Sequence, residues 1–202
     1  MSTGEKLHGA GRSSFEFVDI DLLFQYLLLT TSTVLLDLGC GKGNYAIAAA
    51  KAIGPQGIVY GIDAWQEGLD ELEKNAASEG IHNIVTIRAN LNEHIPLEAS
   101  TVDICFMATV FHDLLRESSG EIVITEIARV LRPGGRLCIV EFKKVEDGPG
   151  PPLSVRLSPE ETEKIITTFG FVKDQITEIG PFHYLLTASP VFLRSGGGLT
   201  GP

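Results

Sequence analysis

Apolar and polar residues follow one another along this chain in two alternating patterns. Short apolar runs, such as Val34–Leu38 with Asp37 as its polar position, are typical of strands buried on both faces of a sheet. Between them lie longer segments whose apolar residues recur at helical spacing. The predicted strands cover 34–38, 58–63, 81–90, 102–108, 136–142, 171–179 and 182–189. The predicted helices cover 15–29, 45–53, 66–78, 118–131 and 159–170.

Capping and turn residues mark where several of these elements begin and end. Ser118 and Glu121 have the spacing of a capping box, in which a serine and a glutamate both bond the first turn of a helix. Ser158 and Glu161 repeat this spacing, with a proline at the first helical position. The sequence Pro133-Gly134-Gly135 predicts a tight turn before the fifth strand.

The order of the elements predicts the fold class. Strands that alternate with helices form a parallel sheet with helices on both faces. The last two strands are joined only by the short Gly180-Pro181 connection, which requires antiparallel pairing. We therefore expect an α/β fold with a doubly wound, mostly parallel seven-stranded sheet and an antiparallel last strand. One domain over 15–192 is expected, after a leader at 1–14 that is flexible or ordered by a ligand, and before a disordered tail at 193–202.

Charge and cysteine content disfavour several classes of partner. The chain has 16 Lys and Arg against 26 Asp and Glu, a net charge of −10, which disfavours nucleic acid and favours a small-molecule substrate. Cys40, Cys105 and Cys138 form no metal-ligand pattern, so we expect no metal site and reduced thiols in a cytoplasmic protein. The apolar stretch at 20–29 is too short to span a membrane.

A glycine-rich turn follows the first predicted strand. Gly39, Gly41 and Gly43 stand at alternate positions before a helix, an arrangement that lets a backbone approach a ligand closely. Asp63 ends the second strand, 20 residues after Gly43, where a carboxylate can accept from the hydroxyls of a ribose. The G-x-G-x-G pattern lacks the third glycine of the dinucleotide fingerprint. The turn thus predicts an adenosine ligand that need not carry a pyrophosphate.

Five stretches of the chain carry motifs in a recognisable order. They are LLDLGCGKGNY at 35–45, YGIDAW at 60–65, IPLEASTVDICFMATVFHDL at 95–114, ARVLRPGGRLCIVEF at 128–142 and GPFHYLLTA at 180–188. Together they resemble the class I S-adenosylmethionine-dependent methyltransferases of the small, single-domain UbiE-like (type 11) kind. The resemblance covers 15–189 and implies a Rossmann-like fold, S-adenosyl-L-methionine as cofactor and S-adenosyl-L-homocysteine as product.

The resemblance also implies which residues bind the cofactor. The glycine turn would contact its methionine portion and ribose by backbone, Asp37 would lie near its amino group, and Asp63 would hold the ribose. Ala64 and Trp65 would flank the adenine. Asn90 stands where the family usually has an acidic residue, with Leu91 or Asn92 as alternatives. The complete set is Asp37, Gly39, Cys40, Gly41, Gly43, Asp63, Ala64, Trp65, Asn90, Leu91 and Met107.

The sequence identifies catalytic residues less clearly than cofactor-binding ones. Methyl transfer from a sulfonium depends mainly on the orientation of the acceptor, and a base is needed only where the acceptor is protonated. The candidates at the carboxyl ends of strands are His112, Asp113 and Glu141. Each also has a purely structural alternative. His112 would be a packed residue at a helix start, Asp113 a carboxylate favoured by a helix dipole, and Glu141 a buried structural carboxylate. His183 is expected to be a core or surface histidine.

Two other functions stay open on the sequence alone. The same β-α-β unit occurs in nicotinamide-dependent oxidoreductases, although the glycine spacing and the missing substrate domain count against one. A non-catalytic S-adenosylmethionine-binding module is the other alternative, because no obvious base stands out. Within the leading hypothesis the acceptor is a small molecule. Quinones and other hydrophobic acceptors follow from the resemblance, and arsenite is disfavoured because only Cys40 lies near the turn.

Overall fold

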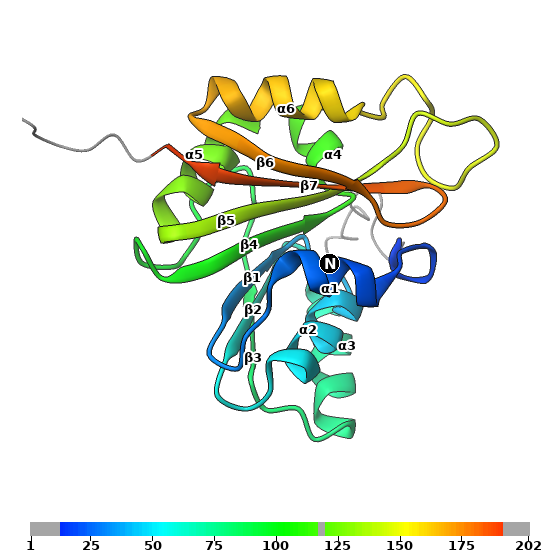
Figure 1. Ribbon diagram of the computed structural model, residues 1–202. Helices are drawn as coiled ribbons and strands as arrows, with labels where there is room; N and C mark the ends of the chain where they lie inside the picture. Colours follow the sequence, from blue (N-terminus) through cyan, green and yellow to red (C-terminus); the bar gives the residue numbers. More distant parts are fainter. Residues whose placement is uncertain (1–12, 117–119, 192–202) are drawn as a thin grey trace, which may run out of the picture.

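The computed structural model describes residues 13–116 and 120–191, in which the seven predicted strands form one sheet (Figure 1). The strands are β1 Val34–Leu38, β2 Ile58–Asp63, β3 Ile84–Arg88, β4 Val102–Ala108, β5 Leu131–Phe142, β6 Phe171–Glu178 and β7 His183–Pro190. The helices are the 3-10 helix η1 Phe15–Phe17, α1 Ile20–Leu27, α2 Asn44–Ile53, α3 Gln66–Ser78, α4 Phe111–Arg116, α5 Gly120–Val130 and α6 Pro159–Thr168.

The sheet has the order β3-β2-β1-β4-β5-β7-β6. The first five strands pair in parallel, and β7 lies between β5 and β6, antiparallel to both. The predicted α/β class, the doubly wound parallel sheet and the antiparallel last strand are therefore confirmed. The strand order reverses at β1, because β2 lies on one side of it and β4 on the other. In such sheets, ligands bind in the crevice at the carboxyl ends of the strands that flank this point.

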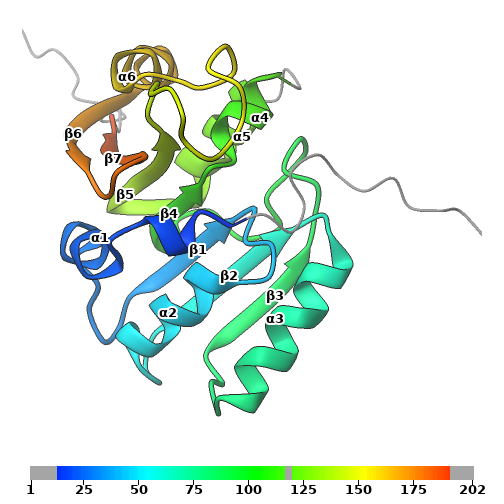
Figure 2. The same ribbon diagram turned by 90° about the vertical axis from the view of Figure 1, so that its right-hand side faces the viewer.

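Helices cover both faces of the sheet, with α1, α2 and α3 on one face and α4, α5 and α6 on the other (Figures 1 and 2). The strand sequences explain this arrangement, because neighbouring residues point to opposite faces. In β1, for example, Leu35 packs with the first helix layer and Leu36 with the second, and both are buried. An apolar run such as β1 thus supplies side chains to the hydrophobic cores on both faces of the sheet.

The predicted helix at 15–29 is wrong in its extent. Val18 has extended backbone (φ −109°, ψ 133°), so the segment divides into η1 and the shorter α1. Asp19 caps α1 by accepting from the Leu22 N–H at 2.9 Å, and Leu28 ends the helix with φ 55°. In the 3-10 turn Phe15 still packs, partly buried, against the core of α1 and α2, whereas Phe17 is exposed.

Several other predicted bounds need correction. β3 is shorter than 81–90, because the Ile81 N–H still bonds the Ala76 carbonyl at the end of α3. β5 begins at Leu131, which pairs with Val102 before a register shift, whereas the sequence placed Leu131 in the preceding helix. The short helix α4 was not predicted as an element. The predicted cap Ser118, residues 1–12 of the predicted leader and the whole predicted tail at 193–202 lie outside the described residues.

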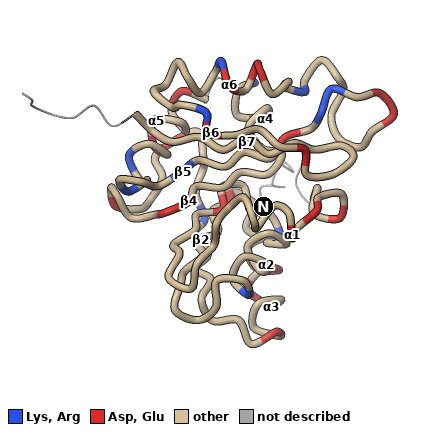
Figure 3. The backbone as a smooth tube through the Cα atoms, in the orientation of Figure 1, with Lys and Arg blue, Asp and Glu red and all other residues tan. Residues whose placement is uncertain are grey.

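Charges are spread over the described part of the fold. Figure 3 shows Lys and Arg on several elements, interspersed with Asp and Glu. Within the described ranges no helix is long and apolar enough to cross a membrane.

The cap of α6 provides a test of how local sequence stabilises this fold. The Ser158 oxygen accepts from the Glu161 N–H at 3.2 Å, and the Ser158 N–H donates to the Glu161 carboxylate at 2.6 Å. We expect Ser158→Ala to cost about 1 kcal/mol. The midpoint temperature of thermal unfolding should then be about 2–4 °C lower. Ser78→Ala, at an exposed serine near the end of α3, is the control and should change the midpoint less; equal shifts would contradict the capping role.

Candidate functional site

The glycine turn connects β1 to α2 and closes on β2. The N–H groups of Gly39 and Cys40 both donate to the Ile62 carbonyl, at 2.8 and 3.2 Å. Gly41 (φ +54°) and Gly43 (φ +77°) have left-handed backbone, which explains their residue type. A Cβ on Gly43 would meet the Leu72 side chain at 2.1 Å, whereas a Cβ on Gly41 would point into open space. Gly43 is thus required by packing, and Gly41 leaves room for a ligand.

Asp63, at the end of β2, fixes this turn from the side. Its carboxylate accepts from the Gly41 N–H at 2.7 Å and from the Trp65 N–H at 2.8 Å. A carboxylate has about four lone-pair sites, so two remain for other donors. The predicted role of Asp63 as the partner of ribose hydroxyls is therefore compatible with these bonds.

Asp37 lies beneath the turn and is 2% exposed. The Ala46 N–H, in the first turn of α2, donates to this carboxyl group, but its Oδ2 has no hydrogen-bond partner among the described residues. Burial, together with the charge of Asp63, raises the pKa of Asp37 to about 7. A cationic group bound here would satisfy the unpaired oxygen, and the predicted ligand carries one in its ammonium group.

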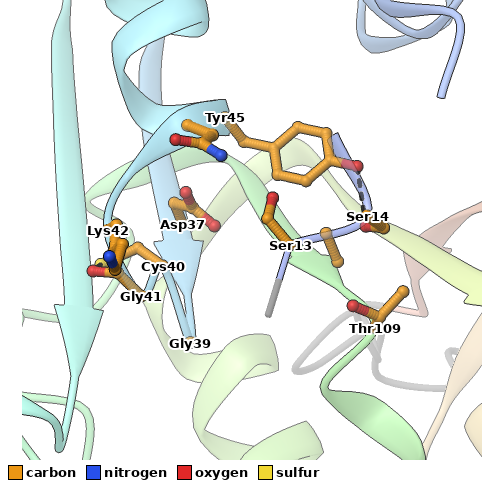
Figure 4. A pocket seen from close by; sticks show the side chains of 11 residues that line it. Ser13, Ser14, Asp37, Gly39, Cys40, Gly41, Lys42, Tyr45 and Thr109 are labelled. Atoms are coloured by element: carbon orange, nitrogen blue, oxygen red, sulfur yellow. Dashed lines mark hydrogen bonds between the residues drawn. The ribbon is translucent and has the colours of Figure 1, made fainter. Parts of the chain in front are cut away.

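A cavity of about 90 Å³, called here the glycine-turn cavity, lies between this turn and the N-terminal segment. Figure 4 shows Ser13, Ser14 and Thr109 across the cavity from Asp37. The Ser14 hydroxyl bonds the Tyr45 hydroxyl at 2.9 Å, which holds the segment before η1 against α2. The described residues that line it are Ser13, Ser14, Asp37, Gly39, Cys40, Gly41, Lys42, Asn44, Tyr45, Ala108 and Thr109.

A larger cavity of about 530 Å³, called here the loop cavity, adjoins the first. Ser13, Ser14 and Thr109 line both. Thr109 has a left-handed backbone (φ +57°), a strained conformation for a β-branched residue. Its lining among the described residues is Ser13, Ser14, Phe17, Thr109, His112, Asp113, Arg116, Phe142, Pro149, Gly150, Pro151, Pro152 and Val155.

Two of the predicted catalytic candidates, His112 and Asp113, line this cavity, and the third, Glu141, contacts His112 without lining it. His112 Nδ1 lies 3.0 and 2.9 Å from the two oxygens of Glu141, which is fully buried. The backbone N–H groups of His112 and Phe142 also donate to Glu141, at 3.1 and 3.2 Å. Because a carboxylate only accepts, we assign the Nδ1 proton to the imidazole. The other ring nitrogen, Nε2, lies 3.6 Å from the carboxylate of Asp113.

Opposing effects set the proton affinity of His112. Burial alone would lower its pKa, but the hydrogen bond and charge of Glu141, with the charge of Asp113, outweigh burial and raise it above 6.5. His183 differs: it is fully buried behind Phe142, and burial lowers its pKa to about 4. The structure thus places His183 in the core.

The residues predicted to surround the adenine only partly come together. Ala64 and Asn90 line a third cavity, of about 470 Å³, beyond the carboxyl end of β3. The Asn90 side-chain oxygen accepts from the Asn92 N–H at 3.0 Å. Trp65 packs its ring on Gly68 of α3, with the Lys42 ammonium 5.9 Å from the ring centre. The predicted adenine contacts of these residues stay predictions.

Three of the other predicted cofactor residues differ in exposure. Met107 is fully buried within the core, so Ala108 and Thr109 contact the glycine-turn cavity in its place. Leu91 packs, partly buried, against the same core. Cys40 lines the glycine-turn cavity, and burial raises the pKa of its thiol, which favours the protonated form.

Local sequence patterns do not reveal the contacts at the junction of the two cavities. Ser14 and Tyr45 are 31 positions apart, and no local pattern indicates that they bond. Thr109 has an ordinary sequence context and an unusual conformation that only the structure reveals. The predicted glycine turn does line the first cavity, and it was recognisable because it is one local stretch of sequence.

Residues 29–175 match the family model described as a methyltransferase domain. A demethylmenaquinone methyltransferase of Lactobacillus johnsonii is 32% identical over 58% of this chain and 47% of its own length. The corresponding enzyme of Geobacillus stearothermophilus is 33% identical over 50% of this chain and 41% of its own. The chain thus spans less than half the length of these curated relatives.

A solved structure matches over more of its length. The crystal structure of a SAM-dependent methyltransferase from Aquifex aeolicus has a TM-score of 0.80 and 30% identity, over 87% of this chain and 92% of that one. The family model covers more than half of the present chain. The resemblance and the cofactor predicted from the five motifs are confirmed: the chain belongs to the S-adenosylmethionine-dependent methyltransferases and to their methyltransferase-domain family.

Proposed function

We propose that this protein transfers the methyl group of S-adenosylmethionine to a small molecule with an ionisable hydroxyl group. The acceptor would occupy the loop cavity, with His112 as general base and Glu141 as the residue that orients it. The observation that carries this proposal is the imidazole of His112 in the wall of the loop cavity, with Nδ1 fixed by Glu141.

Features of the turn support binding of the cofactor at the first cavity. The unpaired oxygen of Asp37 suits the ammonium of the methionine portion, and the open space over Gly41 admits a ligand. The cavity of about 90 Å³ holds only a part of so large a molecule. The remainder would extend past Asp63 toward the cavity at Ala64 and Asn90. When bound, the cofactor supplies a methyl group already activated on a sulfonium.

The residues of the loop cavity would then prepare the acceptor. In the neutral imidazole, Nδ1 keeps its proton for Glu141, and Nε2 can accept the proton of a hydroxyl group. The imidazolium that forms is compensated by Glu141 and by Asp113, whose carboxylate lies 3.6 Å from Nε2. The deprotonated acceptor gains a nucleophilic oxygen or, in a quinol, a nucleophilic ring carbon.

The lining and the relatives together favour an aromatic acceptor. The loop cavity presents the rings of Phe17 and Phe142 and three prolines, with Arg116 as its cation. Flat apolar groups pack well on such surfaces. The matched enzymes of Lactobacillus johnsonii and Geobacillus stearothermophilus are named for a quinone. We therefore propose a hydroxylated aromatic compound, such as a quinol, as the acceptor class.

Calorimetry with S-adenosylhomocysteine tests the cofactor site. We expect Asp63→Ala to weaken binding about a hundredfold, because it removes the proposed ribose partner and two bonds that shape the turn. His112→Ala is the matched control and should bind within about threefold of the unchanged protein. Absence of binding by the folded, unchanged protein would sink the proposed cofactor site.

Asp37 should make both stability and binding depend on pH. The folded protein holds a proton on Asp37 up to pH 7, whereas the unfolded chain loses it near 3.8, so stability falls as the pH rises between these values. Asp37→Asn should therefore raise the thermal midpoint by about 2–8 °C at about pH 8 and by less at about pH 5.

The same substitution should act oppositely on the ligand. Asp37→Asn should weaken S-adenosylhomocysteine binding about tenfold or more, because the ammonium loses its anionic partner. For the unchanged protein, affinity should fall as the pH drops below 7. Asp70→Asn, at an exposed carboxylate on α3, should change neither property. Affinity independent of both the substitution and the pH would contradict this role.

The proposed base is tested by the rate of S-adenosylhomocysteine formation with 1,4-dihydroxynaphthalene and related phenols, kept reduced. His112→Ala should lower the rate by about 10²–10⁴ without loss of cofactor binding. Because only the neutral imidazole accepts a proton, the rate should rise with pH through a pKa above 6.5. Glu141→Gln should move that midpoint to lower pH. Cofactor binding without transfer to any of these phenols would favour a non-catalytic module.

A further inference from the structure

The loop between β5 and α6, residues 143–157, is built around one buried side chain. Arg156 is 5% exposed although it carries a full positive charge. Its Nε makes one hydrogen bond, and its Nη1 and Nη2 make two each, all to backbone carbonyl oxygens of the same loop. The acceptors are Pro151 (2.9 Å) for Nε, Lys143 (3.0 Å) and Val145 (3.1 Å) for Nη1, and Gly148 (3.3 Å) and Pro149 (3.0 Å) for Nη2.

These bonds use the full donor capacity of the side chain. A guanidinium group has five N–H donors in a fixed plane, whereas a lysine ammonium has three. Among the ion pairs found between described residues, none involves Arg156. Its charge is therefore balanced by loop carbonyls, and the course of the loop backbone depends on this one residue.

The same loop forms a wall of the loop cavity. Residues 149–152 line the cavity together with Phe142 and His112. Gly150 (φ +101°) lies so close to Phe142 that a Cβ would approach the ring to 2.5 Å. The guanidinium carbon of Arg156 lies 5.5 Å from the centre of the same ring. The loop backbone and Arg156 thus both pack against the ring of Phe142.

Phe142 in turn contacts the proposed base. Its ring centre lies 6.0 Å from that of His112, at an interplanar angle of 67°. It also follows Glu141 directly, and its N–H donates to that carboxylate. A displaced loop would therefore change both the wall opposite the acceptor and the packing around the imidazole.

We propose that Arg156 is a positioning residue for the acceptor: its five hydrogen bonds hold residues 149–152 and Phe142 where they confine an aromatic acceptor beside His112. This inference rests on the proposed function, because it names a determinant of the same cavity. Arg156 would act through the loop and would not itself touch the reacting atoms.

The experiment compares Arg156→Ala and Arg156→Lys in the full chain saturated with S-adenosylhomocysteine. Lys144→Met is the matched control, since Lys144 is an exposed cation of the same loop, paired with Glu161 at 2.6 Å. Affinity for 2-naphthol, followed by its fluorescence, reports on the loop cavity. Cleavage by Glu-C protease after the exposed Glu146 reports on the loop itself, without need of an acceptor.

We expect both Arg156 variants to bind 2-naphthol about tenfold more weakly, with an unchanged dissociation constant for S-adenosylhomocysteine. Lysine should fail to replace arginine because it leaves two carbonyls without a donor. Cleavage after Glu146 should become about tenfold faster in both variants and stay unchanged in Lys144→Met. Millimolar guanidinium chloride should restore 2-naphthol binding to Arg156→Ala, whereas sodium chloride at the same concentration should not.

Wild-type affinity for 2-naphthol in Arg156→Ala would overturn the inference. Equal losses of affinity for 2-naphthol and for S-adenosylhomocysteine would also overturn it, because they would indicate a general loss of fold. If the unchanged protein binds S-adenosylhomocysteine but not 2-naphthol, the proposed acceptor class fails. The role of Arg156 is then tested by the rate of Glu-C cleavage after Glu146, and an unchanged rate in Arg156→Ala overturns it. Failure to bind S-adenosylhomocysteine at all would instead refute the cofactor site.

Discussion

Carboxylates at the carboxyl ends of parallel strands determine how this site is built, because a carboxylate removed from water must find donors nearby. Glu141 and Asp63 find them in backbone N–H groups, and those bonds fix the local loops: Asp63 holds the glycine turn, and Glu141 holds the start of α4 and the ring of His112. Asp37 is only partly satisfied among the described residues, and its unpaired oxygen is the proposed partner of a cationic ligand. Satisfied carboxylates thus shape the site, and the unsatisfied one motivates the proposed binding of an ammonium group.

The fold was predictable because its signals are local and repeated. Most strands are short apolar runs, and most crossovers contain a helix with helical spacing, although β3 connects to β4 without one. The Gly180-Pro181 connection is too short for anything but an antiparallel pair. The spacing from Gly43 to Asp63 worked in the same way, since both residues belong to one β-α-β unit. Local patterns failed where hydrogen bonding overrides periodicity, as at Asp19, which starts a new helix inside an apolar run.

The rest of the site depends on contacts between distant segments, which no local pattern records. The pairing of His112 with Glu141 spans 29 positions and that of Ser14 with Tyr45 spans 31, so the sequence could offer the first pair only as separate candidates. Arg156 is the clearest case. In the sequence it is one arginine in a loop rich in glycine and proline, and the acidic Glu146 and Asp147 nearby suggest an exposed ion pair as readily as a buried cation. Its role follows only from where the loop carbonyls point.

The pairing of His112 with Glu141 also distinguishes between kinds of acceptor. A purely structural role explains it poorly, because apolar residues of similar volume usually stabilise a core as well as a buried ionisable pair does. Two backbone N–H groups already donate to Glu141, so the imidazole is not needed to satisfy it. A histidine held in one tautomer at the wall of a cavity is suited to accept a proton. An acceptor with a free lone pair, such as a neutral amine, needs no such group, whereas a hydroxyl compound must lose a proton to become a good nucleophile. The geometry therefore favours an acceptor that arrives protonated.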